Sequence, residues 1–272
     1  MISKHVTEAV AHRLASCKAY ELREIALKSG VKTIGTKAAL ESRLLSHYQG
    51  VIDESTRQGR FSFEDGLPSS VLSVDLGYRN LAFVQLTKNN TVKAWSRVDL
   101  ELPSFHPSVA APLVREFVKS RLMPLMPSTG AIAVEQQRAR SNGSFGVFEV
   151  TLRVNCVEAM LWCALHEVTE GRSMPKEAIP RQIVDGYWKD TLLQFASDPS
   201  TAKLTGKDKK QAGTRLVEHW LENNHTIHCS DTLKAQFAQE SKKDDLSDCL
   251  LQALTWYQWR RFILEYTQNA IK

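Results

Sequence analysis

Three β-rich runs follow one another directly, at residues 70–77, 80–87 and 91–98, and they restrict the possible folds more than any other feature. Polar turn residues separate these runs, so neighbouring runs should pair as an antiparallel meander. A helical stretch at 108–126 then leads to a short apolar run at 130–135. This run is too short for a free helix and suits a buried parallel strand. A sheet that contains both kinds of strand pairing is therefore predicted.

The rest of the chain alternates between helical and strand-like segments. Helices are expected at about 146–170, 207–223 and 244–267, and a fifth strand at 178–184. A chain of 272 residues with 43% hydrophobic residues can bury a sizeable core. The order β-β-β-α-β-α-β-α predicts an α/β fold in which helices flank a mixed five-stranded sheet.

The N-terminal part has a different pattern. Apolar residues between positions 14 and 48 follow helical spacing, interrupted by a polar, glycine-containing stretch at 29–35. Gly30 suits the end of a first helix, and Thr36 can cap the start of a second helix, with Lys37 on or near its exposed face. Two short helices joined by a turn are predicted here.

Charge divides the chain in the same way. Residues 1–50 contain eight Lys or Arg and four Asp or Glu, whereas the remainder is nearly balanced and the whole chain has a net charge of +5. Residues 51–69 have no clear periodicity and contain turn-forming residues. We therefore expect a small all-α helical module at 1–50, a linker at 51–69 and a larger α/β domain at 70–272. The mild positive charge favours an anionic partner.

Several classes of protein are excluded at this stage. The five cysteines are odd in number and contain no Cys-x-x-Cys pair, which argues against a disulfide framework and a thiolate zinc site. His225, His228 and Cys229 lack a suitably spaced fourth ligand, so no zinc is expected there. No apolar run approaches the ~18 residues that a membrane span requires, so no membrane association is expected.

Five acidic residues stand out by their positions. Asp75 lies inside an apolar run and Glu135 ends another, and a buried carboxylate is costly unless positive charge compensates it. At the start of the last helix, Asp245 and Asp248 are spaced i,i+3 and Asp244 and Asp248 i,i+4, so either pair projects from one helical face. The helix dipole also favours acids at this position, which is the simpler explanation for these three residues alone.

Together, the strand-end carboxylates and the helical pair would repel one another unless divalent cations lie between them. Oxygen ligands suit Mg²⁺ or Mn²⁺, and two such ions about 3.5–4 Å apart can activate a water molecule and stabilise the leaving oxygen of a phosphodiester. We interpret Asp75, Glu135 and Asp248 as catalytic metal ligands, together with either Asp244 or Asp245. Two Mg²⁺ or Mn²⁺ ions are the expected cofactor.

Three sequence strings identify a resemblance to a known family. They are SVDLGYRN at 73–80, VEQQRARS at 134–141 and SKKDDLSD at 241–248. As a set they resemble the fungal mitochondrial Holliday-junction resolvases, which are of the RuvC type and belong to the ribonuclease H-like superfamily. The resemblance covers most of residues 70–270. Residues 21–30 and 35–44 are similar to the SAP motif, a two-helix DNA-binding module.

The resemblance implies a mitochondrial homodimer that acts in DNA recombination. Such a dimer would cut two opposed strands of a four-way DNA junction, using Mg²⁺ or Mn²⁺ at two copies of the carboxylate site. The approximate two-fold symmetry of a junction matches the symmetry of a dimer. The RuvC pattern of i,i+3 acids favours Asp245 as the partner of Asp248.

Cations near the acids are candidate contacts to the DNA backbone. Arginines that follow Glu135 can hold phosphate bidentately, and lysines at 207–210 and 242–243 can neutralise it. A glycine-containing turn carries an aromatic side chain that could stack on unpaired bases at the junction centre. Solvated charges and core packing are the competing explanations. The candidate DNA contacts are Lys37, Arg138, Arg140, Phe145, Lys207, Lys209, Lys210, Lys242 and Lys243.

Three other functions remain as alternatives. An Asp-x-Gly after a strand also begins the phosphate loop of actin-like ATPases, but the chain has no Gly-Gly pair and no second Asp-x-Gly. A ribonuclease H-like nuclease could act on another substrate, such as an RNA/DNA hybrid or transposon ends. A non-catalytic DNA-binding protein is disfavoured because it would have no reason to keep buried acids.

Overall fold

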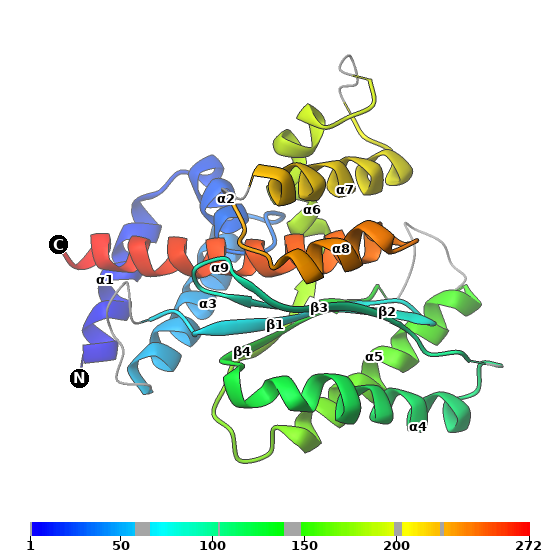
Figure 1. Cartoon of the computed structure of the whole chain (residues 1–272). Helices are drawn as coiled ribbons and strands as arrows, with labels where there is room; N and C mark the ends of the chain where they lie inside the picture. Colours follow the sequence, from blue (N-terminus) through cyan, green and yellow to red (C-terminus); the bar gives the residue numbers. More distant parts are fainter. Residues whose placement is uncertain (1, 58–65, 103, 139–147, 199–202, 224–225) are drawn as a thin grey trace. The chain divides into compact units, whose positions relative to one another are not determined.

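A mixed five-stranded sheet with the strand order β3-β2-β1-β4-β5 underlies the fold (Figure 1). The first three strands form an antiparallel meander, and β4 and β5 continue the sheet in parallel with β1. This arrangement confirms the predicted α/β fold and its mixed sheet. The strands are β1 (Ser70–Leu76), β2 (Asn80–Thr87), β3 (Val92–Asp99), β4 (Ala131–Gln136) and β5 (Lys176–Pro180).

The computed structural model describes residues 2–57, 66–102, 104–138, 148–198, 203–223 and 226–272. The chain forms two units, and each combines separate stretches of sequence. The sheet unit contains Ser69–Arg181 and Asp190–Ala253, and the helical unit contains Met1–Pro68, Gln182–Lys189 and Leu254–Lys272. Within the described ranges, no helix has the length and apolar character needed to cross a membrane.

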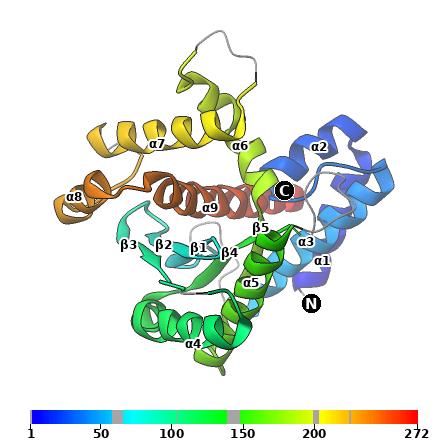
Figure 2. The ribbon, with the colours of Figure 1, turned by 90° about the vertical axis from the view of Figure 1, so that its right-hand side faces the viewer.

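One face of the sheet is covered by α4 (Pro107–Phe117) and α5 (Glu149–Val168), as Figures 1 and 2 show. After α4 the chain continues as a π turn, Val118–Leu122, and a 3₁₀ turn, Met123–Ser128. The predicted helix at 108–126 is therefore interrupted, because a proline such as Pro124 lacks the N–H group that a continuing α-helix requires. The core on this face includes Leu72, Val74, Ile132, Val134, Val114, Phe117 and Leu161.

The opposite face of the sheet is covered by α8 (Asp231–Gln239) and the first part of α9 (Lys243–Ile271), and α7 (Gly206–Asn223) lies beyond these two helices, on their side away from the sheet (Figures 1 and 2). The indole Nε1 of Trp95 on β3 donates to the carbonyl of Leu246 at 3.0 Å. Gln252 Nε2 donates to Ser73 Oγ on β1 at 2.9 Å. These two hydrogen bonds attach the start of α9 to the sheet.

The fifth strand is shorter than predicted. Residue composition predicts it at 178–184, whereas β5 ends at Pro180 and α6 (Arg181–Gln194) begins at once. Pro180 provides the extended residue before the helix. The β-branched residues Ile183 and Val184 favour a strand by composition, but they are buried on α6. Arg181 is therefore not inside a strand but is the first residue of α6, directly after the end of β5.

The N-terminal part forms α1 (Ile2–Ser16), α2 (Ala19–Lys28) and α3 (Lys37–Arg57). As predicted, Gly30 follows the first helix of the pair, α2, and has a positive φ of 74°. Thr36 Oγ1 accepts a hydrogen bond from the Ala39 amide at the start of α3. The start of the expected linker, residues 51–57, is instead helical. It continues α3 because Val51 and Ile52 are buried.

The N-terminal helices share their core with the end of α9. The ring of Tyr48 on α3 packs edge-on against Tyr266, with 5.4 Å between centroids. Glu54 and Arg260 form a largely buried ion pair at 3.0 Å. The helical unit thus depends on the C-terminal stretch of the chain, and residues 1–50 do not form a separate core of their own.

Gly30 permits the close contact between this turn and α9. A Cβ atom at Gly30 would lie less than 3.0 Å from ring atoms of Trp259. We expect Gly30→Ala to lower the free energy of unfolding by about 2–4 kcal/mol, because it adds a steric overlap to an unfavourable positive φ. Urea denaturation measures this change.

Gly50→Ala is the matched control for this prediction. Gly50 lies within α3, and a Cβ there would meet no atom within 4 Å. Alanine in a helix interior should stabilise the protein by up to about 1 kcal/mol. Equal effects of the two substitutions would contradict the proposed role of the Gly30 contact.

Candidate active site

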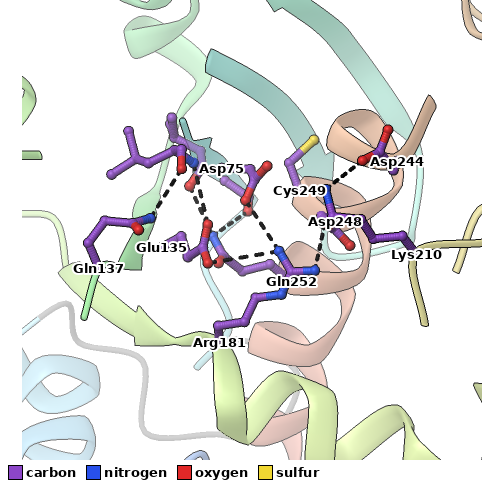
Figure 3. A network of polar contacts seen from close by, with 12 residues as sticks. Asp75, Glu135, Gln137, Arg181, Lys210, Asp244, Asp248, Cys249 and Gln252 are labelled. Atoms are coloured by element: carbon purple, nitrogen blue, oxygen red, sulfur yellow. Dashed lines mark hydrogen bonds and ion pairs between the residues drawn. The ribbon is translucent and has the colours of Figure 1, made fainter. Parts of the chain in front are cut away.

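Three largely buried carboxylates surround one arginine at an edge of the sheet (Figure 3). Arg181 Nη1 lies 3.8 Å from Asp75 Oδ1 and 3.8 Å from Glu135 Oε1, and its Nη2 donates to Asp248 Oδ2 at 2.6 Å. The carboxylate side chains are only 11–13% exposed. The structure therefore brings together Asp75, Glu135 and Asp248, which lie far apart in the sequence.

The register of the parallel strands explains this convergence. Val74 on β1 pairs with Val134 on β4, so the residues that follow, Asp75 and Glu135, reach the same edge. Side chains alternate between the two faces of a strand. Because Val74 and Val134 point into the core beneath α4 and α5, both acids point to the other face, towards the start of α9.

The electrostatics of the cluster show that it carries more negative charge than Arg181 balances. Burial raises the pKa of Asp75 well above its usual range, and the charge and hydrogen bond of Glu135 raise it further. Burial also raises the pKa of Asp248 to about 7, although Arg181 opposes this shift. Unit charges about 4 Å apart interact by about 4 kcal/mol at an effective dielectric constant of about 20. Further positive charge would be needed to keep every carboxylate ionised.

Asp244 and Asp245 differ clearly in their surroundings. Lys210 Nζ donates to Asp244 Oδ2 at 2.6 Å. Burial disfavours ionisation of Asp244, but this bond to Lys210 outweighs it and lowers the Asp244 pKa. Burial and the charges of Asp75 and Asp244 instead raise the pKa of Asp245 to about 6. Asp245 is thus repelled by the negative charge of the buried cluster, whereas Asp244 is paired with a lysine.

The acids line a cavity of about 310 Å³ whose donor set suits a hard cation. Its walls include all five predicted acids together with Arg181, Lys210 and Lys242. Carboxylate oxygens are the ligands that Mg²⁺ and Mn²⁺ prefer. No three acidic, histidine or cysteine side chains of the described residues are arranged as a ready-made ion site. The Arg181 guanidinium lies among the carboxylates instead, so ion binding would require this side chain to move.

Sequence reasoning missed Arg181. Gln136 on β4 pairs with Pro180 on β5, so the residue after Pro180 reaches the same edge as Glu135. The carboxyl ends of parallel strands meet at one edge of a sheet, and that rule would have identified Arg181 if the strand had been ended at Pro180.

Two glutamines that sequence reasoning also missed support the acids. Gln252 lies four residues after Asp248 on α9, and it donates to Ser73 Oγ beneath the cluster. Gln137 Nε2 donates to the carbonyl of Leu76 at 3.2 Å and so connects the ends of β4 and β1. The i,i+4 spacing of Asp248 and Gln252 was the one available signal for Gln252.

The predicted DNA contacts occupy several different environments. Lys210 and Lys242 line the carboxylate cavity. Lys243 turns to Glu218, with 2.9 Å between the charged atoms, and does not line this cavity. Arg138 is exposed and lines a second cavity of about 340 Å³ between the end of β4 and the start of α5. Glu135 and Arg181 line both cavities.

The remaining candidates lie away from the acids or outside the described residues. Lys207 and Lys209 lie in the first turn of α7, and Lys207 is exposed. Lys37 is exposed at the start of α3, where its ammonium donates to the carbonyl of Ala15 at 3.0 Å. Arg140 and Phe145 fall outside the described residues.

The chain is similar to known proteins in its family, in its sequence and in its structure. The family described as "Mitochondrial resolvase Ydc2 / RNA splicing MRS1" matches residues 71–241 and 225–264. "Cruciform cutting endonuclease 1, mitochondrial" from Saccharomyces cerevisiae is 24% identical over an alignment of 301 residues, covering 90% of this chain and 82% of the relative. The crystal structure of the yeast mitochondrial Holliday junction resolvase Ydc2 matches with a TM-score of 0.62 at 22% identity, over 93% of this chain and 98% of that one. The matches confirm the fold that the sequence strings implied.

Proposed function

The chain belongs to the family described as mitochondrial resolvase Ydc2 / RNA splicing MRS1, and from this we propose that it is a mitochondrial endonuclease that resolves four-way (Holliday) DNA junctions in recombination. One observation supports nuclease chemistry above all: Asp75, Glu135 and Asp248 meet at the sheet edge, with Asp245 in the same cavity. The relatives named as a cruciform cutting endonuclease and a Holliday junction resolvase support the choice of substrate.

We propose that Asp75, Glu135, Asp245 and Asp248 hold two divalent cations, Mg²⁺ or Mn²⁺. Such ions, when bound, lower the pKa of a water molecule and stabilise the leaving oxygen of a phosphodiester. The protein fixes the ligands on two adjacent strands and one helix, so their geometry depends little on flexible loops. Asp244, paired with Lys210, orients that lysine instead of binding metal.

We propose that cations around the cavity position the DNA backbone. Lys210 and Lys242 line the cavity and supply compact charges for a phosphate. Burial lowers the pKa of Lys210, but the hydrogen bond and charge of Asp244 outweigh this and raise it overall, so the ammonium stays protonated. Arg138 in the second cavity and Lys207 on α7 would extend the backbone contact on either side. Arg140, Phe145, Lys209 and Lys243 remain sequence-based proposals for further contacts.

We propose that two copies of the chain act together and that the N-terminal helices add to DNA binding. A junction has two opposed strands to cut, and a two-fold dimer presents the same site twice. Lys37, exposed at the start of α3, is the proposed DNA contact of the N-terminal part.

Cleavage assays on matched substrates test the proposed function. With Mg²⁺, we expect paired, symmetric cuts in a mobile four-way junction at a rate at least about 10²-fold above that for linear duplex DNA of the same sequence. End-labelled strands on denaturing gels measure both rates. Preferred cutting of an RNA/DNA hybrid would indicate a different nuclease. Junction binding without cutting at any divalent cation concentration would indicate a non-catalytic DNA-binding protein.

A further inference from the structure

Arg181 places a permanent positive charge among the carboxylates that are proposed to bind metal. Its guanidinium bonds Asp248 at 2.6 Å and lies 3.8 Å from both Asp75 and Glu135 (Figure 3). An arginine cannot lose its charge in a protein, so it balances negative charge at every pH. The side chain is 29% exposed, so part of its surface faces solvent.

We propose that Arg181 is a positioning residue that acts as a built-in counter-ion: it competes with divalent cations for Asp75, Glu135 and Asp248 and leaves them when a cation binds. This inference rests on the proposed metal-dependent nuclease function. The guanidinium and a divalent cation require the same carboxylate oxygens, so the two cannot both be held by them. A site arranged in this way stays ordered without metal and binds metal less tightly than the carboxylates alone would.

The surroundings of Arg181 give the released side chain a place to go. Arg181 lines the carboxylate cavity and also the second cavity, whose walls include Gln137, Arg138 and Asn155. A rotation of the side chain would carry the guanidinium from one cavity to the other without moving α6. Guanidinium groups bind phosphate bidentately, so the DNA backbone offers Arg181 a replacement for the carboxylates. Exchange of partners would then couple loading of the metal to the presence of DNA.

Metal binding without DNA separates this proposal from the nuclease assay. Isothermal titration calorimetry with Mn²⁺ would compare the full-length protein with Arg181→Met, which keeps an unbranched side chain but removes the guanidinium and its charge. We expect at least about tenfold tighter Mn²⁺ binding by Arg181→Met, because a competing cation has been removed. We also expect its Tm in EDTA to be lower by ~3 °C or more, and Mn²⁺ to raise its Tm more than that of the unsubstituted protein.

Arg172→Met is the matched control. Arg172 is also an arginine of the sheet unit, but it donates to the carbonyl of Met126 at 2.8 Å and lines neither cavity. Its loss should lower Tm equally with EDTA and with Mn²⁺ and leave Mn²⁺ affinity unchanged. Arg181→Lys is the second variant, for the case that Arg181→Met does not fold in EDTA. A lysine ammonium cannot contact several carboxylates at once as a guanidinium does. The Mn²⁺ affinity of Arg181→Lys should therefore lie between those of the unsubstituted protein and Arg181→Met.

The outcomes separate the counter-ion role of Arg181 from the existence of the metal site. Equal Mn²⁺ affinities of Arg181→Met, Arg181→Lys and the unsubstituted protein would overturn the counter-ion role while leaving the metal site intact. Weaker Mn²⁺ binding by Arg181→Met would overturn it as well, because the arginine would then support the ion. If none of these proteins bound Mn²⁺, the proposed metal site would be wrong, and the counter-ion role would fall with it.

Discussion

Asp75→Asn should reduce the rate of junction cleavage by about 10³-fold, which corresponds to about 4 kcal/mol of transition-state stabilisation. Asp75 lies near the end of β1 beside Glu135, and an amide at this position removes one of the proposed metal ligands from the centre of the cluster. Binding of the junction should remain within about threefold, since phosphate contacts come from cations and a buried acid contributes none of them. Single-turnover cleavage and a gel-shift titration measure the two effects separately.

Asp190→Asn provides the control for Asp75→Asn. Asp190 is exposed on α6 and does not line the carboxylate cavity, so the Asp190→Asn protein should cleave the junction at the normal rate. Undiminished cleavage by Asp75→Asn would refute the assignment of the carboxylate cluster as the catalytic centre. Equal loss of cleavage and binding would show that Asp75 is needed for the fold instead of for chemistry.

The two neighbouring acids on α9 should respond very differently to the same change. Asp245→Asn should lower cleavage by about 10²-fold or more, because the charge of Asp245 is felt by the buried cluster. Asp244→Asn should lower it by less than about tenfold, through the loss of the Lys210 ion pair. Matched single-turnover rates at saturating Mg²⁺ compare the two variants.

The comparison decides which of Asp244 and Asp245 acts with Asp248. A larger loss for Asp244→Asn would exchange the two roles and make the i,i+4 pair with Asp248 the metal-binding pair. Similar small losses would leave Asp75, Glu135 and Asp248 as the ligands, and Asp245 would then have no catalytic role. Both proteins should bind the junction normally, so a defect in binding would point to an altered α9.

The positions of the acids could be predicted from the sequence because each depends on a local pattern. A carboxylate within or at the end of an apolar run is conspicuous, and the side-chain alternation of a strand determines its face. The spacing on α9 restricted the helical acids to two pairs in the same way. Their meeting at one edge then follows from the parallel pairing of β1 with β4.

Arg181 could not be predicted, because no local pattern in the sequence marks it. Its place depends on where β5 ends, and strand composition at Ile183 and Val184 suggested a later end. The sequence suggested that only divalent cations could hold these acids together. Arg181 already balances part of their negative charge, so this inference was too strong. Burial of both residues on a helix overrides their strand preference.

Contacts between distant parts of the helical unit were equally invisible in the sequence. Nothing near Gly30 indicates that Trp259 packs against it, and nothing near Tyr48 indicates Tyr266. Residues 51–57 therefore read as a polar linker, although their apolar side chains are buried in the structure.

The shared core of the helical unit has a consequence for biosynthesis. A ribosome produces α1, α2 and α3 first, but residues 254–272, which complete their core, are made much later. Until these residues have been made, Tyr48 and its neighbours lack the partners that shield them from water, and pairing across so long a loop is slow. A premature stop codon shortly before residue 254 would leave the first three helices without this packing surface.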